Sequence, residues 1–235
     1  MSDKKKTAPS PACAACTGEL PNTVCMTEGG SVGKGCPTVT AKDLLAQANR
    51  EYDNPETRSF ALQASIQEAA CYENRHERPY VMQPSKTRIV EICEFADRMR
   101  FKRLGLVFCM GLKSEAGIVD GILKGKGFEV ISVCCKAGRT SKDLIGIEDR
   151  DKIFQGTDES MCNPIFQAAV VNEEKTDLNI LLGLCVGHDS LFLKHAHAYS
   201  TVLAVKDRVT GHSPLAPIYL HGSYYRKLAS SRPTE

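Results

Sequence analysis

Beyond Lys102 the sequence alternates short apolar runs with helical segments, and this alternation constrains the fold more than any other feature. The apolar runs are of strand length and nearly continuous: "RLGLVFCMG", "FEVISVCC", "DLNILLGLC" and "STVLAVKD". Segments with helical patterns separate them, such as "SEAGIVDGILKGKG" and "NPIFQAAVVNEEKT". Such an order predicts βαβ units and a parallel sheet covered by helices on both faces. We therefore expect a Rossmann-like three-layer α/β domain over residues 101–235.

Three other regions precede this domain. Residues 1–12, rich in Lys, Pro, Ser and Ala, indicate a disordered lead. Residues 13–40 contain many turn-forming residues and no apolar period, so this segment cannot bury enough surface to fold without help. Residues 41–100 show apolar residues at helical spacing, with Thr40 and Asn54 as expected N-caps. We expect a metal-binding segment followed by a helical region.

The cysteine content needs a chemical explanation. The chain has 11 cysteines among 235 residues. It shows no apolar segment of about 20 residues that could cross a bilayer, and its N-terminus does not read as a signal peptide. We therefore expect a cytoplasmic protein, in which disulfides are rare and metal binding or thiol chemistry accounts for the cysteines. The net charge of +2 does not favour nucleic acid as a partner, and we expect none.

The first set of cysteines lies in the segment 13–40. Two of them, two residues apart, form a chelating turn, and two more follow; the set is Cys13, Cys16, Cys25 and Cys36. Four thiolates suit zinc or an iron–sulfur cluster, and binding would supply the folding energy that the segment lacks. A zinc ribbon usually has a second two-residue pair, which is absent here, and Pro37 follows the last cysteine as in ferredoxin-like runs. We expect an iron–sulfur cluster of the [4Fe-4S] type, with zinc as the alternative.

The second set lies at strand ends of the predicted sheet. The carboxyl ends of parallel strands share one edge, and ligands bind there. Five cysteines are expected at this rim as a second cluster site: Cys109, Cys134, Cys135, Cys162 and Cys185. Successive residues on a strand point to opposite faces, so either member of the adjacent pair could be the ligand. A packing role for all five is the competing interpretation, because cysteine is often buried as a small apolar residue.

Polar residues accompany these cysteines. His188, three residues after Cys185, is a possible nitrogen ligand at the start of a helix. Lys206 and Arg208 follow the last strand and could hold an anionic substrate or cluster sulfide, although a solvated charged turn explains them equally well. A cysteine not used as a ligand could act as a nucleophile. The candidate catalytic residues are Cys134, Cys135, His188 and Lys206.

Several longer motifs resemble a known family. The stretches "CCKAG", "MCNPIFQAAVVNEEKTDLNILLGLCVGHDSLF" and "VKDRVTGHSPLAPIY", with the leading four-cysteine segment, resemble domain of unknown function 1847. This is a family of predicted metal-binding proteins found mainly in anaerobic bacteria and archaea. The resemblance covers nearly the whole chain and implies metal binding, but it implies no reaction.

These observations favour an iron–sulfur protein in which the first cluster relays electrons to the rim. The rim would then reduce a small molecule or handle its sulfur, with a separate protein as electron donor. Two other functions stay open. In one, zinc stabilises the N-terminal segment while the rim cysteines form a thiol redox pair or a sulfur relay. In the other, the protein is a non-enzymatic metal carrier or sensor.

Overall fold

The structure is a computed structural model, and it describes residues 10–229. The chain divides into two compact units, Met1–Ile66 and Gln67–Glu235. Of the lead predicted over residues 1–12, residues 1–9 lie outside the described part of the chain.

The first unit contains short helices joined by turns. Its elements are η1 (Cys13–Ala15), α1 (Pro37–Thr40), α2 (Lys42–Arg50), η2 (Glu51–Asp53) and the first part of α3 (Pro55–Ala70). Asn54 caps α3, because its Oδ1 accepts hydrogen bonds from the backbone N–H groups of Glu56 and Thr57 at 2.9 and 3.1 Å. Between residues 10 and 66 only Thr23 and Gly35 are buried. This part of the chain therefore has no buried apolar core of its own.

The second unit is built on a four-stranded parallel sheet, which confirms the predicted α/β class. Its strands are β1 (Arg103–Phe108), β2 (Glu129–Cys134), β3 (Leu178–Leu184) and β4 (Ser200–Val205). The strand order is β2-β1-β3-β4, and every pair is parallel. β3 is buried along its whole length and β1 along its middle. Burial on both faces explains why these two central strands are nearly continuous apolar runs.

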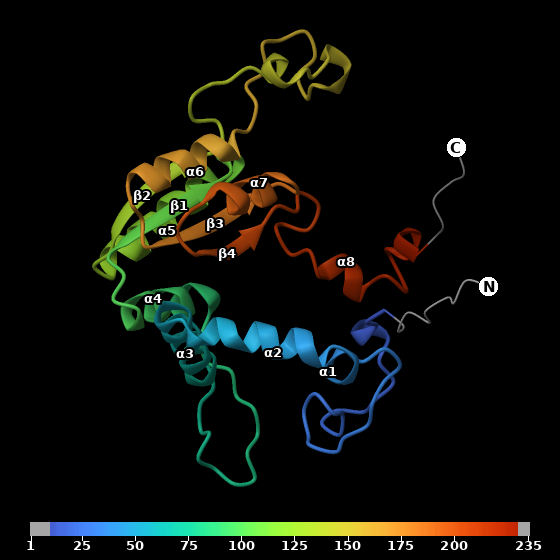
Figure 1. Cartoon of the computed structure of the whole chain (residues 1–235). Coiled ribbons are helices and arrows are strands. Elements are labelled where there is room, and N and C mark those ends of the chain that lie inside the picture. The colour runs from blue at the N-terminus through green and yellow to red at the C-terminus, as the bar shows by residue number, and fades with distance from the viewer. Residues whose placement is uncertain (1–9, 230–235) are drawn as a thin grey trace, which may run out of the picture. The chain divides into compact units, whose positions relative to one another are not determined.

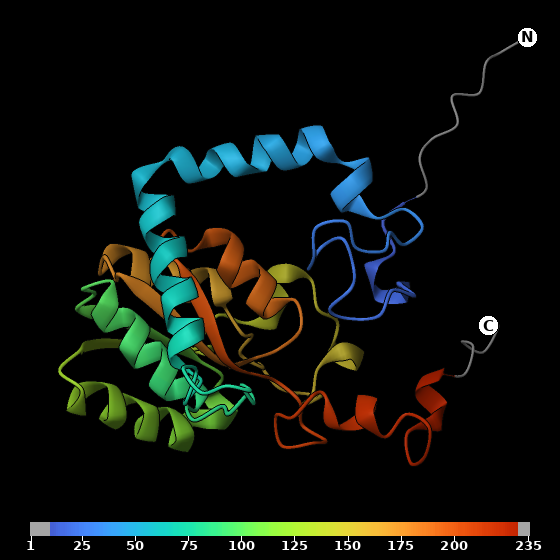
Figure 2. The same cartoon turned by 90° about the horizontal axis from the view of Figure 1, so that it is seen from below.

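Helices cover both faces of the sheet, as Figures 1 and 2 show. On one face α4 (Arg88–Arg98) and α5 (Lys113–Gly125) pack on Leu104, Leu106 and Ile180. On the other face α6 (Pro164–Glu173) and α7 (His188–His195) pack on Val107 and Leu181. The alternation of inward residues along β1 thus supplies both cores, as the pleat of a strand requires.

Two side chains fix the start of α6 at the carboxyl end of the sheet. Asn163 caps the helix, because its Oδ1 accepts a hydrogen bond from the backbone N–H of Phe166 at 2.9 Å, and Pro164 occupies the first turn. The fully buried Gln167 donates from Nε2 to the carbonyl oxygens of Val133 and Phe108, at 2.8 and 3.2 Å. The helix is therefore tied to the last residues of β1 and β2.

The connections carry further short elements. They are η3 (Met110–Leu112), η4 (Lys142–Ile145), η5 (Asp149–Asp151), α8 (Ala216–Tyr219) and η6 (Arg226–Ala229). The connection from β2 to α6 leaves the sheet as a long excursion, which Figure 1 shows in yellow beyond α6. A bridge between Ser141 and Ser160 closes its base, beside an ion pair of 2.9 Å between Lys142 and Glu159. This closure brings the chain back to the sheet edge.

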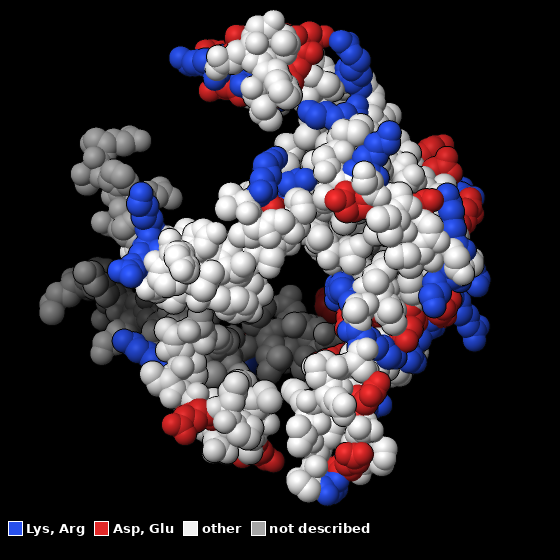
Figure 3. All heavy atoms as spheres, turned by 180° about the vertical axis from the view of Figure 1, so that it is seen from behind, with Lys and Arg blue, Asp and Glu red and all other residues white. Residues whose placement is uncertain are grey.

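The surface charge is mixed. On the face seen in Figure 3, Lys and Arg side chains are interspersed with Asp and Glu. This agrees with the formal net charge of +2. Within residues 10–229, no helix is both long enough and apolar enough to cross a membrane.

Candidate functional site

The rim cysteines lie where the sequence analysis predicted them along the chain. Cys109 directly follows β1, Cys134 is the last residue of β2, and Cys185 directly follows β3. Cys162 lies two residues before α6. Because the strands are parallel, all of these positions share the carboxyl edge of the sheet.

Three of the five thiols form a hydrogen-bonded group, which we call the thiol trio: Cys109, Cys135 and Cys162. The Sγ atoms of Cys135 and Cys162 are 3.6 Å apart, and Cys109 is hydrogen-bonded to Cys135. The backbone holds this arrangement, since the N–H of Asn163 donates to the carbonyl oxygen of Cys135 at 2.8 Å. The N–H of Met110 also donates to Cys135 Sγ at 3.3 Å. Residues from three separate segments thus converge on one buried sulfur.

The two adjacent cysteines have different environments. Cys135 is 3% exposed and lies within the trio. Cys134 is only half-buried, and no hydrogen bond to another thiol is found for it among the described residues. Side chains alternate in direction along a strand, so only one member of the pair can face the trio. That member is Cys135, although both were candidates from the sequence.

The three thiols of the trio differ in pKa, and their hydrogen bonds are a main cause of the difference. The hydrogen bond to Cys135, followed by burial, raises the pKa of Cys109 to about 12. The hydrogen bond from Cys109 lowers the pKa of Cys135, but the hydrogen bond to Cys162 and burial outweigh it and leave that pKa raised. The hydrogen bond between Cys162 and Cys135 lowers the pKa of Cys162 to about 7, with help from the charge of Lys136. Cys162 is therefore the thiol of the trio that ionises most easily.

Cationic side chains surround the trio. The side chain of Lys206 is hydrogen-bonded to Cys109, and Lys136 lies near enough to favour ionised Cys162. The guanidinium of Arg208 donates to Cys185 Sγ at 3.1 Å. Cys185 thus sits at the same rim but pairs with Arg208. Positive charge near thiols favours their thiolate forms.

His188 begins α7 at the same edge. Burial lowers its pKa, and the nearby charge of Lys136 lowers it further. The imidazole is therefore neutral over a wider pH range than that of a free histidine, which is the form that can accept a proton or bind a metal. Its role stays a prediction, as does the role of Lys206.

Sequence reasoning did not identify three contributors to this site. Lys136 follows the cysteine pair, and its ammonium donates to the carbonyl oxygen of Ser160. Gly111 and Gly183 lie next to the head of Lys206, since a Cβ at either position would be 3.7 Å from Lys206 Nζ, an ordinary van der Waals contact. The only available signal was the interruption of the apolar run "LLGLC" by Gly183, which has a φ of +66°.

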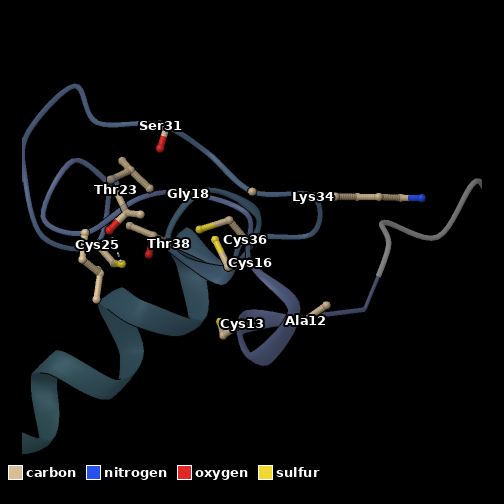
Figure 4. A pocket seen from close by; sticks show the side chains of 13 residues that line it. Ala12, Cys13, Cys16, Gly18, Thr23, Cys25, Ser31, Lys34, Cys36 and Thr38 are labelled. Atoms are coloured by element: carbon tan, nitrogen blue, oxygen red, sulfur yellow. Dashed lines mark hydrogen bonds between the residues drawn. The ribbon is translucent and has the colours of Figure 1, made fainter.

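The four N-terminal cysteines line one cavity of about 250 Å³ in the first unit. Figure 4 shows the Cys16 and Cys36 sulfurs pointing toward each other, whereas the Cys25 sulfur lies apart from them. Cys25 Sγ is instead within 3.2 Å of Thr23 Oγ1. Gly33 allows close approach, since a Cβ there would lie 2.9 Å from Cys16 Sγ. Across residues 10–229, no three or more His, Cys, Asp or Glu side chains are grouped closely enough to hold a metal ion as they stand.

The donor set of this cavity nevertheless suits a thiophilic metal. Four cysteines are the ligand complement of structural zinc and of common iron–sulfur clusters. The segment that carries them is joined by turns and lacks a buried apolar core. Sites of this kind commonly close around their metal as the segment folds. Metal binding at Cys13, Cys16, Cys25 and Cys36 stays a prediction that the residues fit.

The fold and the rim define a class of protein: a parallel α/β protein with a cysteine centre at the carboxyl edge of its sheet. The chain belongs to the family described as protein of unknown function DUF1847, whose model matches residues 36–203. It is also 42% identical over 195 residues to the uncharacterized protein MJ0455 of Methanocaldococcus jannaschii, an alignment that covers 83% of this chain and 90% of that protein. The family match includes all five rim cysteines and Cys36, while Cys13, Cys16 and Cys25 precede it.

Proposed function

We propose that this protein is a metal-binding redox protein whose reactive centre is the thiol trio. One observation carries the proposal: Cys135 and Cys162 have sulfurs 3.6 Å apart. A disulfide bond is about 2.0 Å long, so a movement of roughly 1.5 Å would join the two sulfurs. Nearby thiols of unequal pKa are the usual components of a thiol–disulfide couple.

The couple would work by exchange with a disulfide substrate. The thiolate of Cys162 attacks one substrate sulfur, which forms a mixed disulfide and releases the other substrate sulfur as a thiolate. The thiol of Cys135 then loses its proton and attacks Cys162 Sγ, which releases the second substrate sulfur. The substrate disulfide gains two electrons and becomes two thiols, while two protein thiols become one disulfide. The raised pKa of Cys109 suits a hydrogen-bond donor to Cys135 rather than a nucleophile.

The N-terminal cysteines would hold the metal. We propose an iron–sulfur cluster of the [4Fe-4S] type there, with zinc as the alternative. An iron–sulfur cluster would supply one-electron transfer when bound, whereas zinc would supply only stability. The support is the presence of four thiols around one cavity in a unit whose residues 10–66 form no buried apolar core.

A second function is favoured by the same sulfur separation. Two thiolates on one tetrahedral metal ion, with metal–sulfur bonds of 2.3 Å, would be about 3.8 Å apart. The 3.6 Å between Cys135 and Cys162 is close to this value. The rim could therefore hold a metal ion through the trio, with Cys185 or His188 as a further ligand. Cys134 would not take part in either case.

The test begins with protein purified without oxygen. Iron, zinc and acid-labile sulfide are measured together with the visible spectrum, for the native chain and for Cys16→Ser and Cys162→Ser. The proposal predicts that Cys16→Ser loses most of the metal and that Cys162→Ser retains it. Loss of a separate share of metal in Cys162→Ser would support the rim metal site instead.

The thiol couple is tested by equilibration in dithiothreitol redox buffers, followed by alkylation and peptide mapping. We expect a reversible disulfide between Cys135 and Cys162, which disappears in Cys135→Ser and in Cys162→Ser. Cys134→Ser is the matched control, because it removes the neighbouring thiol outside the trio. If no peptide links Cys135 to Cys162 at any potential, the redox centre is wrong.

A further inference from the structure

The carboxyl edge of the sheet carries more positive charge than its own residues neutralise. Lys136, Lys206 and Arg208 all lie near the rim thiols. In the described chain, none of these three forms an ion pair with Asp or Glu. By contrast, Arg103 at the opposite end of β1 pairs with both Glu129 and Glu174.

Lys206 is held over the ends of the central strands. It is half-buried, and its ammonium lies next to Gly111 and Gly183. A half-buried charge without an opposite charge is unfavourable, because it loses hydration without a compensating ion pair. The side chain is hydrogen-bonded to Cys109.

Arg208, two residues after Lys206, presents a planar fork at the same rim. One guanidinium nitrogen donates to Cys185 Sγ at 3.1 Å, and Arg208 is otherwise exposed. Its other N–H groups are available to a ligand, and the fork matches the paired oxygens of carboxylate, phosphate or sulfur oxyanions.

The nearby carboxylates are engaged with backbone groups. Asp207 Oδ1 accepts hydrogen bonds from the N–H groups of Val209 and Thr210, both at 3.0 Å. Asp189 Oδ1 accepts one from the N–H of Ser190 at 2.8 Å. Neither residue forms an ion pair with the rim cations among residues 10–229. Neither acid therefore occupies the N–H donor groups of the rim cations.

We propose that Lys206 and Arg208 form a binding site for a small oxyanion beside the thiol trio, with Lys136 adding positive charge from the other side. The inference rests on the proposed function, because the anion would be the acidic group of the substrate on which the trio acts. It names the substrate class as a small molecule that carries a carboxylate, a phosphate or a sulfur oxyanion. The same charge would also speed the approach of an anionic substrate to the thiols.

The first test is calorimetric titration of the full chain, as purified, with inorganic phosphate and with sulfate at low ionic strength. We expect saturable binding that weakens about tenfold in Lys206→Gln and in Arg208→Gln, as the loss of one charge-assisted hydrogen bond implies. Lys124→Gln is the matched control, because it removes the same charge from α5, where Lys124 pairs with Asp120. Absence of binding, or equal weakening in the control, would overturn the proposal.

A second measurement tests whether the rim cations bind an anionic reagent or only stabilise the thiolates of the trio. Iodoacetate and iodoacetamide are similar in size, but only the first is an anion. We expect the ratio of their rates with Cys162 to fall in Lys206→Gln and to be unchanged in Lys124→Gln. If the cations only stabilise thiolates, both rates will fall equally and the anion site is wrong.

The two proposals fail separately. If phosphate binds but no Cys135–Cys162 disulfide forms, the anion site is supported and the proposed redox function is wrong. If a reversible disulfide forms but neither phosphate nor sulfate binds, the redox function is supported and the proposed anion site is wrong.

Discussion

At the scale of single residues, Cys134 and Cys135 show how neighbours in sequence acquire different chemistry. Both follow the same apolar run, yet only Cys135 is nearly fully buried and bonded to other thiols. Alternation along β2 turns one side chain toward the trio and the other away. Hydrogen bonds then make the three trio thiols unequal, with Cys162 the most acidic and Cys109 the least. Reactivity should follow this order.

The pH dependence of alkylation tests that order. The pKa of Cys162 is lowered from 9.0 to about 7, so its thiolate fraction rises through neutral pH, below the range of an ordinary cysteine. The pKa of Cys109 is raised to about 12, so this thiol stays protonated and slow throughout. We expect iodoacetamide labelling of Cys162, followed by peptide mass spectrometry, to have a midpoint near pH 7. Equal midpoints for Cys162 and Cys109 would contradict this assignment.

Gly183 allows a second prediction at this scale. Its φ of +66° favours glycine, and a Cβ there would collide with Leu112 Cδ1. Gly183→Ala should lower the free energy of unfolding by about 1–3 kcal/mol, measured by urea denaturation. The control is Gly117→Ala in α5, where a Cβ would meet nothing within 4 Å. That change should be neutral or stabilising, because alanine favours a helix. Equal losses in both variants would contradict the steric argument.

At the scale of elements, α6 determines where Cys162 lies. The helix begins two residues after the thiol, and Asn163 between them both caps it and donates its N–H to the carbonyl oxygen of Cys135. Gln167, one turn further on, joins it to the ends of β1 and β2. The excursion over residues 139–160 closes at its base and returns the chain to this helix. The distance between Cys135 and Cys162 thus depends on the start of one helix.

The cap can be removed without touching a thiol. Asn163→Ala should lower the free energy of unfolding by about 1 kcal/mol, because the N–H of Phe166 loses its acceptor. It should also make the Cys135–Cys162 disulfide less favourable, measured in dithiothreitol buffers. Asn163→Asp keeps an acceptor at the same position and should restore both properties. A disulfide unaffected in Asn163→Ala would show that the cap does not position Cys162.

At the scale of the whole molecule, the two units differ in what can stabilise them. The second unit has two apolar cores, one on each face of its sheet. In the first unit the described residues form no buried apolar core, and its turns surround a cavity lined by four cysteines. Apolar burial is the main stabilising contribution in globular proteins. The first unit should therefore depend on metal much more than the second.

Metal removal tests this difference. Treatment of the anaerobically purified chain with a chelator should increase proteolytic cleavage between Cys13 and Cys36. The thermal transition of the α/β unit, followed by circular dichroism, should change little. The variant Cys16→Ser should reproduce the chelated pattern without a chelator. Equal protection of the segment before and after metal loss would contradict a stabilising metal.

The sequence by itself determined the class of fold. Strand-length apolar runs separated by helical patterns are sufficient, because a strand buried on both faces must be apolar at every position. The same order placed five cysteines at the carboxyl edge of the sheet, since parallel strands end together. The turn-forming residues of the segment 13–40, with no apolar period, also predicted a segment that cannot bury enough surface to fold without help.

Only the tertiary structure decided which of these residues meet. Strand order, the direction of each side chain and the return of the chain at Ser160 bring Cys109, Cys135 and Cys162 together. The same arrangement keeps Cys134 outside the trio and places Cys185 within hydrogen-bond distance of Arg208. Lys206 reaches the same place from the end of β4, with its ammonium next to Gly111 and Gly183. Such contacts join residues far apart in the chain, and local patterns of hydrophobicity carry no information about them.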